Sequence, residues 1–148
     1  MGVGWIYNGS EFTEEQIGDN YGFVYVITNI KGNKKYIGKK LFYSARTKQV
    51  KGKKKKYKVP SDWQEYYGSN EELKKDIQTQ GEGQFIREIL HLCKTRGECS
   101  YLEAKEQFNR NVMEGDGYYN TWIMVRVHKS HIKDYNAKLT EAAKGSKT

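Results

Sequence analysis

Residues 22–28 are Gly-Phe-Val-Tyr-Val-Ile-Thr, and residues 35–38 are Lys-Tyr-Ile-Gly. Aromatic and β-branched residues in such short runs suit a pleated, half-buried surface, so each run predicts a β-strand. Between them lies Lys31-Gly32-Asn33, whose composition is typical of a tight turn. The three segments together predict a β-hairpin, and the rest of the chain is placed around it.

The segments next to the hairpin are polar and predict less regular structure. Residues 1–20 predict an extended N-terminal arm with one short helical turn near Glu14–Ile17. After the hairpin, the spacing of apolar residues predicts a short helix over Lys39–Thr47. We expect residues 47–60 to form a basic insertion, a loop that closes at Pro60.

The second half of the chain alternates between helical and strand-like patterns. Asn70 is a good N-cap for a helix over Glu71–Gln80, and Gln84–Leu92 predicts a central strand. Ser100 begins the best helical pattern, which runs to about Met113, and Tyr119–His128 predicts a final strand. Together these elements predict an α+β (mixed α/β) fold, a small central antiparallel or mixed sheet of about three strands flanked by helices.

Length and composition favour a single soluble domain. At 148 residues we expect one main domain over 21–128, with the 1–20 arm before it and a polar tail over 129–148. No run approaches the roughly 18 apolar residues of a membrane span, and the N-terminus lacks the pattern of a signal peptide. The two cysteines imply no disulfide framework. We therefore expect a cytoplasmic protein without membrane contacts.

The positive charge is concentrated in one segment. Residues 31–58 contain 13 of the 26 Lys and Arg and none of the 18 Asp and Glu, so the segment carries +13 and the remainder −5. Close ammonium groups repel one another and bind phosphates, from which condensed counterions are released. The segment predicts contact with a nucleic-acid backbone, although a solvated loop remains the plainer alternative. The predicted contact residues are listed here: Lys39, Lys40, Lys51, Lys53, Lys54, Lys55, Lys56, Lys58 and Trp63. Trp63 has two open roles, to buttress the basic loop or to touch a base.

The hairpin sequence resembles the paired signature of the GIY-YIG nuclease family. Phe23-Val-Tyr25 stands where the family has Gly-Ile-Tyr, with Gly22 displaced by one position, and Tyr36-Ile-Gly38 is intact. Arg46, eight residues past Gly38, resembles the family's catalytic arginine, which lies on its first helix. Glu103 resembles the metal-binding glutamate, and Asn120 resembles the asparagine that closes the active-site module.

The resemblance implies an endonuclease that hydrolyses phosphodiester bonds in DNA with one Mg²⁺ (or Mn²⁺), of the small phage-encoded or homing type. A single glutamate can anchor a hydrated Mg²⁺, and an arginine fork fits phosphate oxygens. Tyr36 and Tyr25 would activate water, and the resemblance favours Tyr36 as the general base without deciding between them. Lys39 and Lys40 are expected to lower the pKa of Tyr36.

Several alternatives remain open at this stage. Ser100-x-x-Glu103 also fits a capping box, in which Glu103 only satisfies backbone donors at a helix start. The protein could be an inactive module on the same fold that binds DNA or structured RNA. The partner expected from the basic 31–58 segment is DNA, and an oligomer is possible. If the resemblance is right, Tyr25, Tyr36, Arg46 and Glu103 converge around one phosphate-sized space.

Overall fold

The predicted hairpin is present and lies inside a larger sheet. In the computed structural model, which describes residues 4–145, strands β3 (Gly22–Asn29) and β4 (Lys34–Leu41) pair antiparallel in one register along their whole length. Asn33 takes a positive φ of 49° in the turn between them, a conformation that asparagine tolerates better than most residues. Strand β3 is buried almost throughout.

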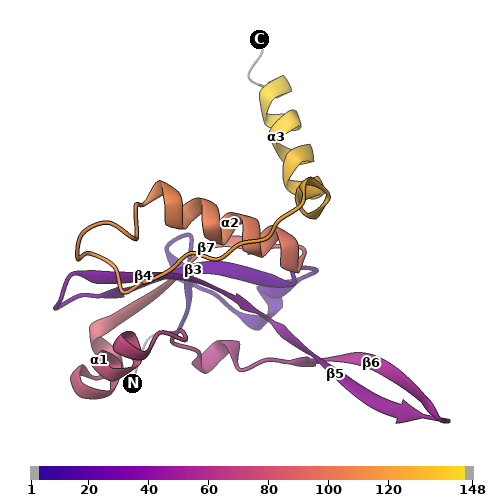
Figure 1. Cartoon of the computed structure of the whole chain (residues 1–148), viewed down its shortest axis with the longest axis horizontal. Helices are drawn as coiled ribbons and strands as arrows, with labels where there is room; N and C mark the ends of the chain where they lie inside the picture. The colour runs from indigo at the N-terminus through magenta and orange to yellow at the C-terminus, as the bar shows by residue number, and fades with distance from the viewer. Residues whose placement is uncertain (1–3, 146–148) are drawn as a thin grey trace.

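The main sheet has five strands in the order β2-β1-β7-β3-β4 (Figure 1). Strand β7 (Phe85–Cys93) confirms the predicted central strand and pairs antiparallel with β3. The α+β class is confirmed, but the sheet is larger than the expected three strands. The difference arises because the N-terminal arm contributes β1 (Ile6–Tyr7), parallel to β7, and β2 (Ser10–Glu11).

Alternation along β3 divides the core between the two faces of the sheet. Phe23 and Tyr25 belong to an aromatic cluster that includes the buried Trp5, whereas Val24 and Val26 belong to a cluster that includes Cys93 and residues of helix α2. Helix α2 covers one face, and the 60–70 segment and helix α1 lie on the other (Figure 1). The sheet thus separates two small cores, and β4 is the edge strand between them.

Helix α1 (Glu71–Gln80) begins as predicted, because the Asn70 side chain accepts a hydrogen bond from the Leu73 N–H at 2.9 Å. Helix α2 (Arg96–Asn109) begins earlier than expected. Its N-cap is Thr95, whose hydroxyl accepts from the Glu98 N–H at 3.1 Å. The alternative in which Glu103 forms a capping box with Ser100 is therefore excluded, because both residues lie inside the helix.

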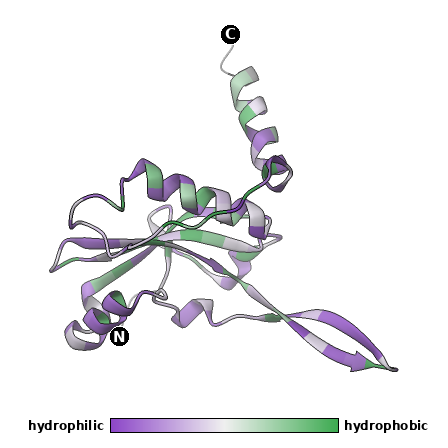
Figure 2. Ribbon diagram, in the orientation of Figure 1, coloured by the Kyte–Doolittle hydropathy of each residue, from purple (hydrophilic) through white to green (hydrophobic). Residues whose placement is uncertain are grey.

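The basic segment is a second β-hairpin rather than a helix followed by a loop. Strands β5 (Tyr43–Val50) and β6 (Lys53–Pro60) pair only with each other and turn at Lys51-Gly52, where both residues have positive φ. The expected helix over 39–47 and the expected loop over 47–60 are both wrong. Along β6, successive lysines alternate between the two faces of the hairpin. The hairpin is hydrophilic along most of its length (Figure 2).

The predicted strand over 119–128 is also wrong. Tyr118 forms a single bridge with Lys35, and residues 120–128 have no regular secondary structure. The apolar and β-branched residues here favour a strand, but the β4 edge they would need is already occupied, as described below. The polar tail is helical, with the short helix η4 (Lys129–Ile132) followed by α3 (Lys133–Gly145).

Three short 3₁₀ turns complete the described chain. Helix η1 (Glu14–Ile17) confirms the turn predicted in the arm, η2 (Trp63–Glu65) follows the basic hairpin, and η3 (Glu82–Gln84) precedes β7. Within residues 4–145, none of the helices has the length and apolar character that a bilayer span requires.

Candidate active site

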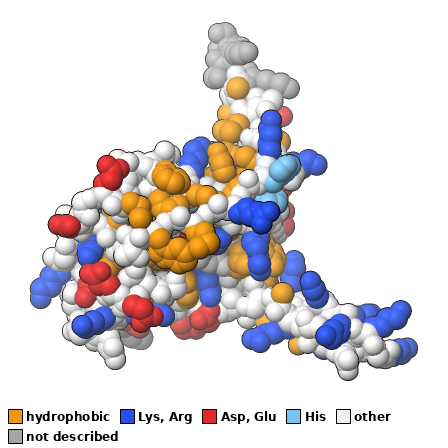
Figure 3. All heavy atoms as spheres, in the orientation of Figure 1, with side chains coloured by type: hydrophobic (Ala, Val, Ile, Leu, Met, Phe, Trp, Pro, Cys, Tyr) orange, Lys and Arg blue, Asp and Glu red, His pale blue; other side chains and the backbone are white. Residues whose placement is uncertain are grey.

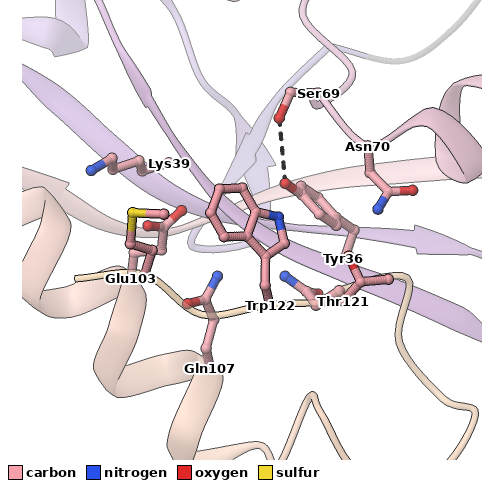
Figure 4. A pocket seen from close by; sticks show the side chains of 10 residues that line it. Tyr36, Lys39, Ser69, Asn70, Glu103, Gln107, Thr121 and Trp122 are labelled. Carbon is pink, nitrogen blue, oxygen red and sulfur yellow. Dashed lines mark hydrogen bonds between the residues drawn. The ribbon is translucent and has the colours of Figure 1, made fainter.

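A cleft of about 370 Å³ lies along the outer edge of β4. Strand β4 contributes Tyr36 and Lys39, and α2 contributes Glu103 from the other side (Figure 4). The remaining lining residues come from the segment before α1 and from the segment after Tyr119, apart from one on α2: Ser69, Asn70, Gln107, Asn120, Thr121, Trp122 and Met124. The cleft therefore brings together four segments that are far apart in the sequence.

The outward-facing N–H groups of β4 position the cleft. The Lys35 N–H donates to the Gly117 carbonyl at 3.0 Å, and the Ile37 N–H donates to Asn120 Oδ1 at 3.0 Å. The Lys39 N–H hydrogen-bonds the Glu103 carboxylate. Three partners thus occupy alternate residues of an edge that would otherwise be unpaired. This occupation explains why residues 119–128 do not continue as a sixth strand.

Asn120 acts as a side-chain extension of the sheet. Its Nδ2 also donates to the Ile37 carbonyl at 2.8 Å, and Gln107 Nε2 donates to the same oxygen at 3.2 Å. Asn70 Nδ2 donates to the Tyr119 carbonyl at 3.0 Å, so the start of α1 is tied to the same segment. Asn120 thus lies in the predicted site and holds its backbone in place.

Glu103 is half-buried and faces the cleft. Burial raises the pKa of its carboxyl, although the Lys39 ammonium and the Lys39 N–H act in the opposite direction. A carboxylate kept partly from water, with a cation and a backbone donor beside it, is a typical arrangement at functional sites. Glu103 therefore lies on the side of α2 that faces the edge of β4.

The two tyrosines have different environments. Tyr36 is half-buried, and its hydroxyl lies 3.5 Å from Ser69 Oγ in the cleft (Figure 4). Tyr25 is 1% exposed and its ring centroid lies 6.2 Å from that of Tyr36. Burial is the largest cause that raises the pKa of each phenol, strongly for Tyr25, and the neighbouring Tyr66 raises it further. Only Tyr36 of this pair reaches the cleft surface.

The expected lowering of the Tyr36 pKa by two lysines does not occur. Lys39 Nζ donates to Ser100 Oγ at 2.6 Å, toward α2. Lys40 Nζ pairs with Asp62 at 2.6 Å and lies 4.1 Å from the centroid of the Tyr66 ring. The two ammonium groups have other partners, and the pKa of Tyr36 is raised by burial instead.

Arg46 lies outside the cleft. It is exposed on β5, opposite Tyr57 in the β5–β6 register, rather than on a helix. The structure therefore brings Tyr36, Glu103 and Asn120 together, with Tyr25 directly beneath Tyr36, but leaves Arg46 on the basic hairpin. Spacing from Gly38 suggested Arg46, and the unexpected β5–β6 hairpin explains its different position.

The predicted contact lysines on the hairpin are all exposed. These lysines are Lys51, Lys53, Lys54, Lys55, Lys56 and Lys58. Together with Arg46 and Lys48, which are also exposed, they form one group of cations. The hairpin extends away from the body, and Lys and Arg side chains cover it in Figure 3. Trp63, in contrast, is 5% exposed in the aromatic core, with its ring 5.3 Å from that of Phe42. Of its two open roles, burial favours the buttress at the base of the hairpin.

A second hollow of about 360 Å³ continues from the cleft toward the hairpin. Lys39 lines both spaces, and Lys40 and Arg96 add two further cations to the second. Sequence reasoning missed Arg96, Gln107, Ser69 and Trp122. Arg96 follows Thr95, the N-cap of α2. A helix start predicted at Thr95 instead of Ser100 would have placed Arg96 in the first turn of the helix. The other three residues carry no local signal.

Metal binding at this site would depend on Glu103. Within the described residues 4–145, no group of three His, Cys, Asp or Glu side chains comes together. A single carboxylate suits Mg²⁺, which keeps several of its waters and uses one or two protein carboxylates. The cleft, at about 370 Å³, is large enough to admit those waters.

Comparison with known proteins finds one family model that matches most of the chain. A family model described as "Putative endonuclease segE, GIY-YIG domain" matches residues 5–123, a range that begins at the buried Trp5 and includes every residue that lines the cleft except Met124. No curated protein and no solved structure matches the chain.

Proposed function

Because the chain belongs to the GIY-YIG nuclease family, we propose that it is a metal-dependent endonuclease that hydrolyses phosphodiester bonds in DNA, of the small phage-type or homing-type class. The observation that carries the proposal is the single cleft at the edge of β4 that Tyr36, Lys39 and Glu103 all line. A polar hydroxyl, a cation and a carboxylate are the groups that hydrolysis of a phosphodiester requires.

Glu103 would hold the Mg²⁺ (or Mn²⁺). The Lys39 N–H fixes the orientation of its carboxylate, and burial keeps the carboxylate partly from water. When bound, such an ion neutralises charge on the phosphate and assists departure of the leaving oxygen. Lys39 lies beside the same carboxylate and offers a second positive charge to the phosphate.

Tyr36 would orient the attacking water. Burial raises its pKa above the ordinary value near 10, so at neutral pH the hydroxyl is protonated in the metal-free protein. A protonated phenol accepts a hydrogen bond from water and donates one to a phosphate oxygen or to Ser69. Tyr25 is too deeply buried to touch substrate and supports the Tyr36 ring from below.

The cations divide into two groups with separate roles. Lys39 contacts the scissile phosphate, and Lys40 and Arg96 in the second hollow contact the next phosphate along the strand. Arg46 and the hairpin lysines bind the backbone farther from the cleavage point. Arg46 thereby acts in binding rather than at the reacting phosphate.

The shape of the hairpin supports DNA rather than RNA as the substrate. Directly opposed residues in the register show that both faces carry cations: Lys48 opposes Lys55 on one face, and Lys58 projects from the other beside Ala45. A two-stranded ribbon fits the major groove of B-form DNA, about 12 Å wide, and would meet phosphates on both sides. The major groove of A-form RNA is deep and narrow, and side chains cannot read it.

The alternative is an inactive nucleic-acid-binding module on the same fold. Its specific support is that Arg46 lies outside the cleft and that the first half of the signature is Phe-Val-Tyr. Such a module would bind DNA through the hairpin without cleaving it.

Cleavage assays separate the two proposals. Supercoiled plasmid incubated with the protein and Mg²⁺ is expected to be nicked, and Glu103→Gln is expected to lower the rate at least about 100-fold because the metal loses its protein ligand. Fluorescence anisotropy should show that Glu103→Gln still binds DNA. Glu88→Gln, at an exposed glutamate on β7, is the matched control. Equal nicking by Glu103→Gln and the parent would contradict the proposed site.

The same variant should change how stability depends on pH. The folded protein holds the Glu103 proton to higher pH than the unfolded chain does, because burial raises this pKa. The free energy of unfolding therefore falls as pH rises from about 4, the ordinary glutamate pKa, through the raised pKa. Glu103→Gln lacks this loss, so relative to the parent it gains stability on going from pH 4 to pH 7. Denaturant titrations at both pH values measure the gain, and none is expected for Glu88→Gln.

A further inference from the structure

Trp122 is exposed at the edge of the cleft, unlike the other two tryptophans. Trp5 and Trp63 are 1% and 5% exposed in the aromatic core, whereas Trp122 is 63% exposed. Its indole lines the cleft, and Figure 4 draws it beside Tyr36 and Glu103. Met124, 72% exposed, lines the same cleft. On the face shown in Figure 3, apolar side chains gather where this segment runs between α2 and the sheet.

The backbone before Trp122 is held firmly, although the indole itself is open to solvent. The Tyr119 N–H donates to the Lys35 carbonyl at 2.7 Å, and Asn120 bonds both backbone groups of Ile37. Within the described part of the chain, no aromatic ring or ammonium group stacks on the Trp122 indole. A largely exposed indole thus lies beside the polar centre of the cleft, on a backbone that hydrogen bonds hold in place.

We propose that Trp122 stacks on a nucleobase next to the phosphate held at Tyr36 and Glu103. This inference rests on the proposed nuclease function and assigns the substrate group that the apolar rim of the cleft binds. Every base has a π-face, so an aromatic side chain binds bases without strong sequence preference. Met124 supplies a soft apolar wall at the same rim. The scissile phosphate and its neighbouring base would then be held by opposite parts of one cleft.

The geometry has a consequence for the substrate. A base can stack on Trp122 only if it separates from its neighbour on that side, and such unstacking is unfavourable in an intact duplex. Sites where a base is already unstacked, such as a mismatch, a gap or a frayed end, are therefore expected to bind more tightly than continuous duplex.

Indole fluorescence tests the proposal without any cleavage step, because the other two tryptophans are buried. The full-length Glu103→Gln variant is titrated, with chelator present, with a thymidine dodecamer and with an abasic deoxyribose-phosphate dodecamer of equal charge. We expect quenching by the thymidine strand and little by the abasic strand when anisotropy shows equal occupancy. Equal quenching by both strands would overturn the proposal.

Variants at position 122 provide the second measurement. Trp122→Ala should weaken binding of the thymidine strand on the order of tenfold to a hundredfold and leave the abasic strand unaffected, whereas Trp122→Tyr should retain most of the affinity. Met113→Ala, at an apolar residue that is 50% exposed outside the cleft, is the matched control. Unchanged binding of the thymidine strand by Trp122→Ala would overturn the proposal. The proposal would also be overturned if the substitution changed the oligomeric state of the protein and nothing else.

The two proposals fail in different ways. If the protein stacks bases but is not a nuclease, quenching and the loss in Trp122→Ala persist and no plasmid is nicked. If it is a nuclease without base stacking, the parent nicks plasmid and Trp122→Ala nicks at the same rate with the same affinity.

Discussion

Gly38 is the position where β4 passes directly beneath the phenol of Tyr25. These two residues are register partners, and a Cβ built at position 38 would lie 2.4 Å from Tyr25 Oη and 2.9 Å from Tyr36 Cε2. Tyr25 is fully buried among aromatic rings, so its hydroxyl has little room to move. A glycine is required here because both tyrosines of the site lean over the same backbone.

Gly38→Ala is therefore expected to destabilise the protein. Overpacking against a buried ring costs about 1–3 kcal/mol, and the shift would also displace Tyr36 from the cleft. Denaturant titration measures the loss. Gly83→Ala is the control, since a Cβ there meets nothing within 4 Å. If both substitutions changed stability equally, the close approach of Tyr25 would not be the cause.

Among single residues, three that the motif indicated are brought by the structure to one cleft. Tyr36 and Asn120 lie in the cleft as the motif indicated, and so does Glu103. Arg46 does not, because a spacing of eight residues has a different meaning on a strand than on a helix. The position of Trp122 in the cleft could not be predicted. Residues 119–128 look like a strand, and their sequence does not reveal that the β4 edge, with which such a strand would pair, is already occupied.

Among the elements, the β5–β6 hairpin is unusual because it packs on no other strand or helix along most of its length. Its opposing residues are exposed on both faces, with the eight cations of residues 46–58 and no acid among them. Isolated two-stranded hairpins are marginally stable in water, and repulsion between lysines weakens this one further. Cation–aromatic contacts help near its base, where Lys58 lies 4.8 Å from the Tyr21 ring centroid. Phosphate contacts would relieve the remaining repulsion.

Replacing the four consecutive lysines at 53–56 by glutamine should weaken DNA binding and make it depend less steeply on salt concentration. The slope of log K against log [salt] is about −0.9 per phosphate contact, so it should flatten by up to about 3.5 if all four bind phosphate. Anisotropy titrations at several salt concentrations measure it, and cleavage should persist at saturating enzyme. The control replaces four exposed lysines outside the hairpin, Lys74, Lys75, Lys129 and Lys133. An equal change in the control would show that net charge, not the hairpin, controls binding.

At the scale of elements, local pattern predicted strands and helices where one face is buried. Strands β3 and β7 and helix α1 are as expected, because their apolar residues meet the core. The hairpin β5–β6 lacks an apolar face, so no periodicity indicated it. The strand β1 is too short to produce a pattern, and its place beside β7 depends on Trp5, whose indole N–H donates to the Trp63 carbonyl at 2.6 Å.

For the whole molecule, the charge asymmetry is also a division in shape. The body contains the sheet, α1 and α2, while the cationic hairpin and helix α3 extend from it in different directions (Figure 1). The hairpin leaves the body beside the second hollow, so a DNA strand bound along it would continue past Lys40 to Lys39 and the cleft. Most of the +13 segment thus lies on the basic hairpin and at the end of β4 that lines the two hollows.

The body extends past residue 128, which the sequence suggested as its end. Ile132 is 8% exposed, the Thr95 hydroxyl donates to the His131 carbonyl at 3.3 Å, and a Cβ at Gly97 would lie 2.4 Å from His131 Cβ. Helix η4 therefore packs on the start of α2. Beyond it, Tyr135 contacts Tyr101, with ring centroids 6.0 Å apart, and Leu139 is 49% exposed.

Two truncations are therefore expected to differ sharply in stability. A chain ending at residue 136 keeps Ile132 and Tyr135. Its free energy of unfolding should lie within about 0.5 kcal/mol of that of the full chain, because the part of α3 that it loses makes few contacts with the body. A chain ending at residue 128 exposes the surface that Ile132 covers and loses the His131 contact with α2, at a cost of about 1.5–3 kcal/mol. Denaturant titrations measure both. Equal stability of the two truncations would place the end of the folded body at residue 128 and would make η4 a surface appendage.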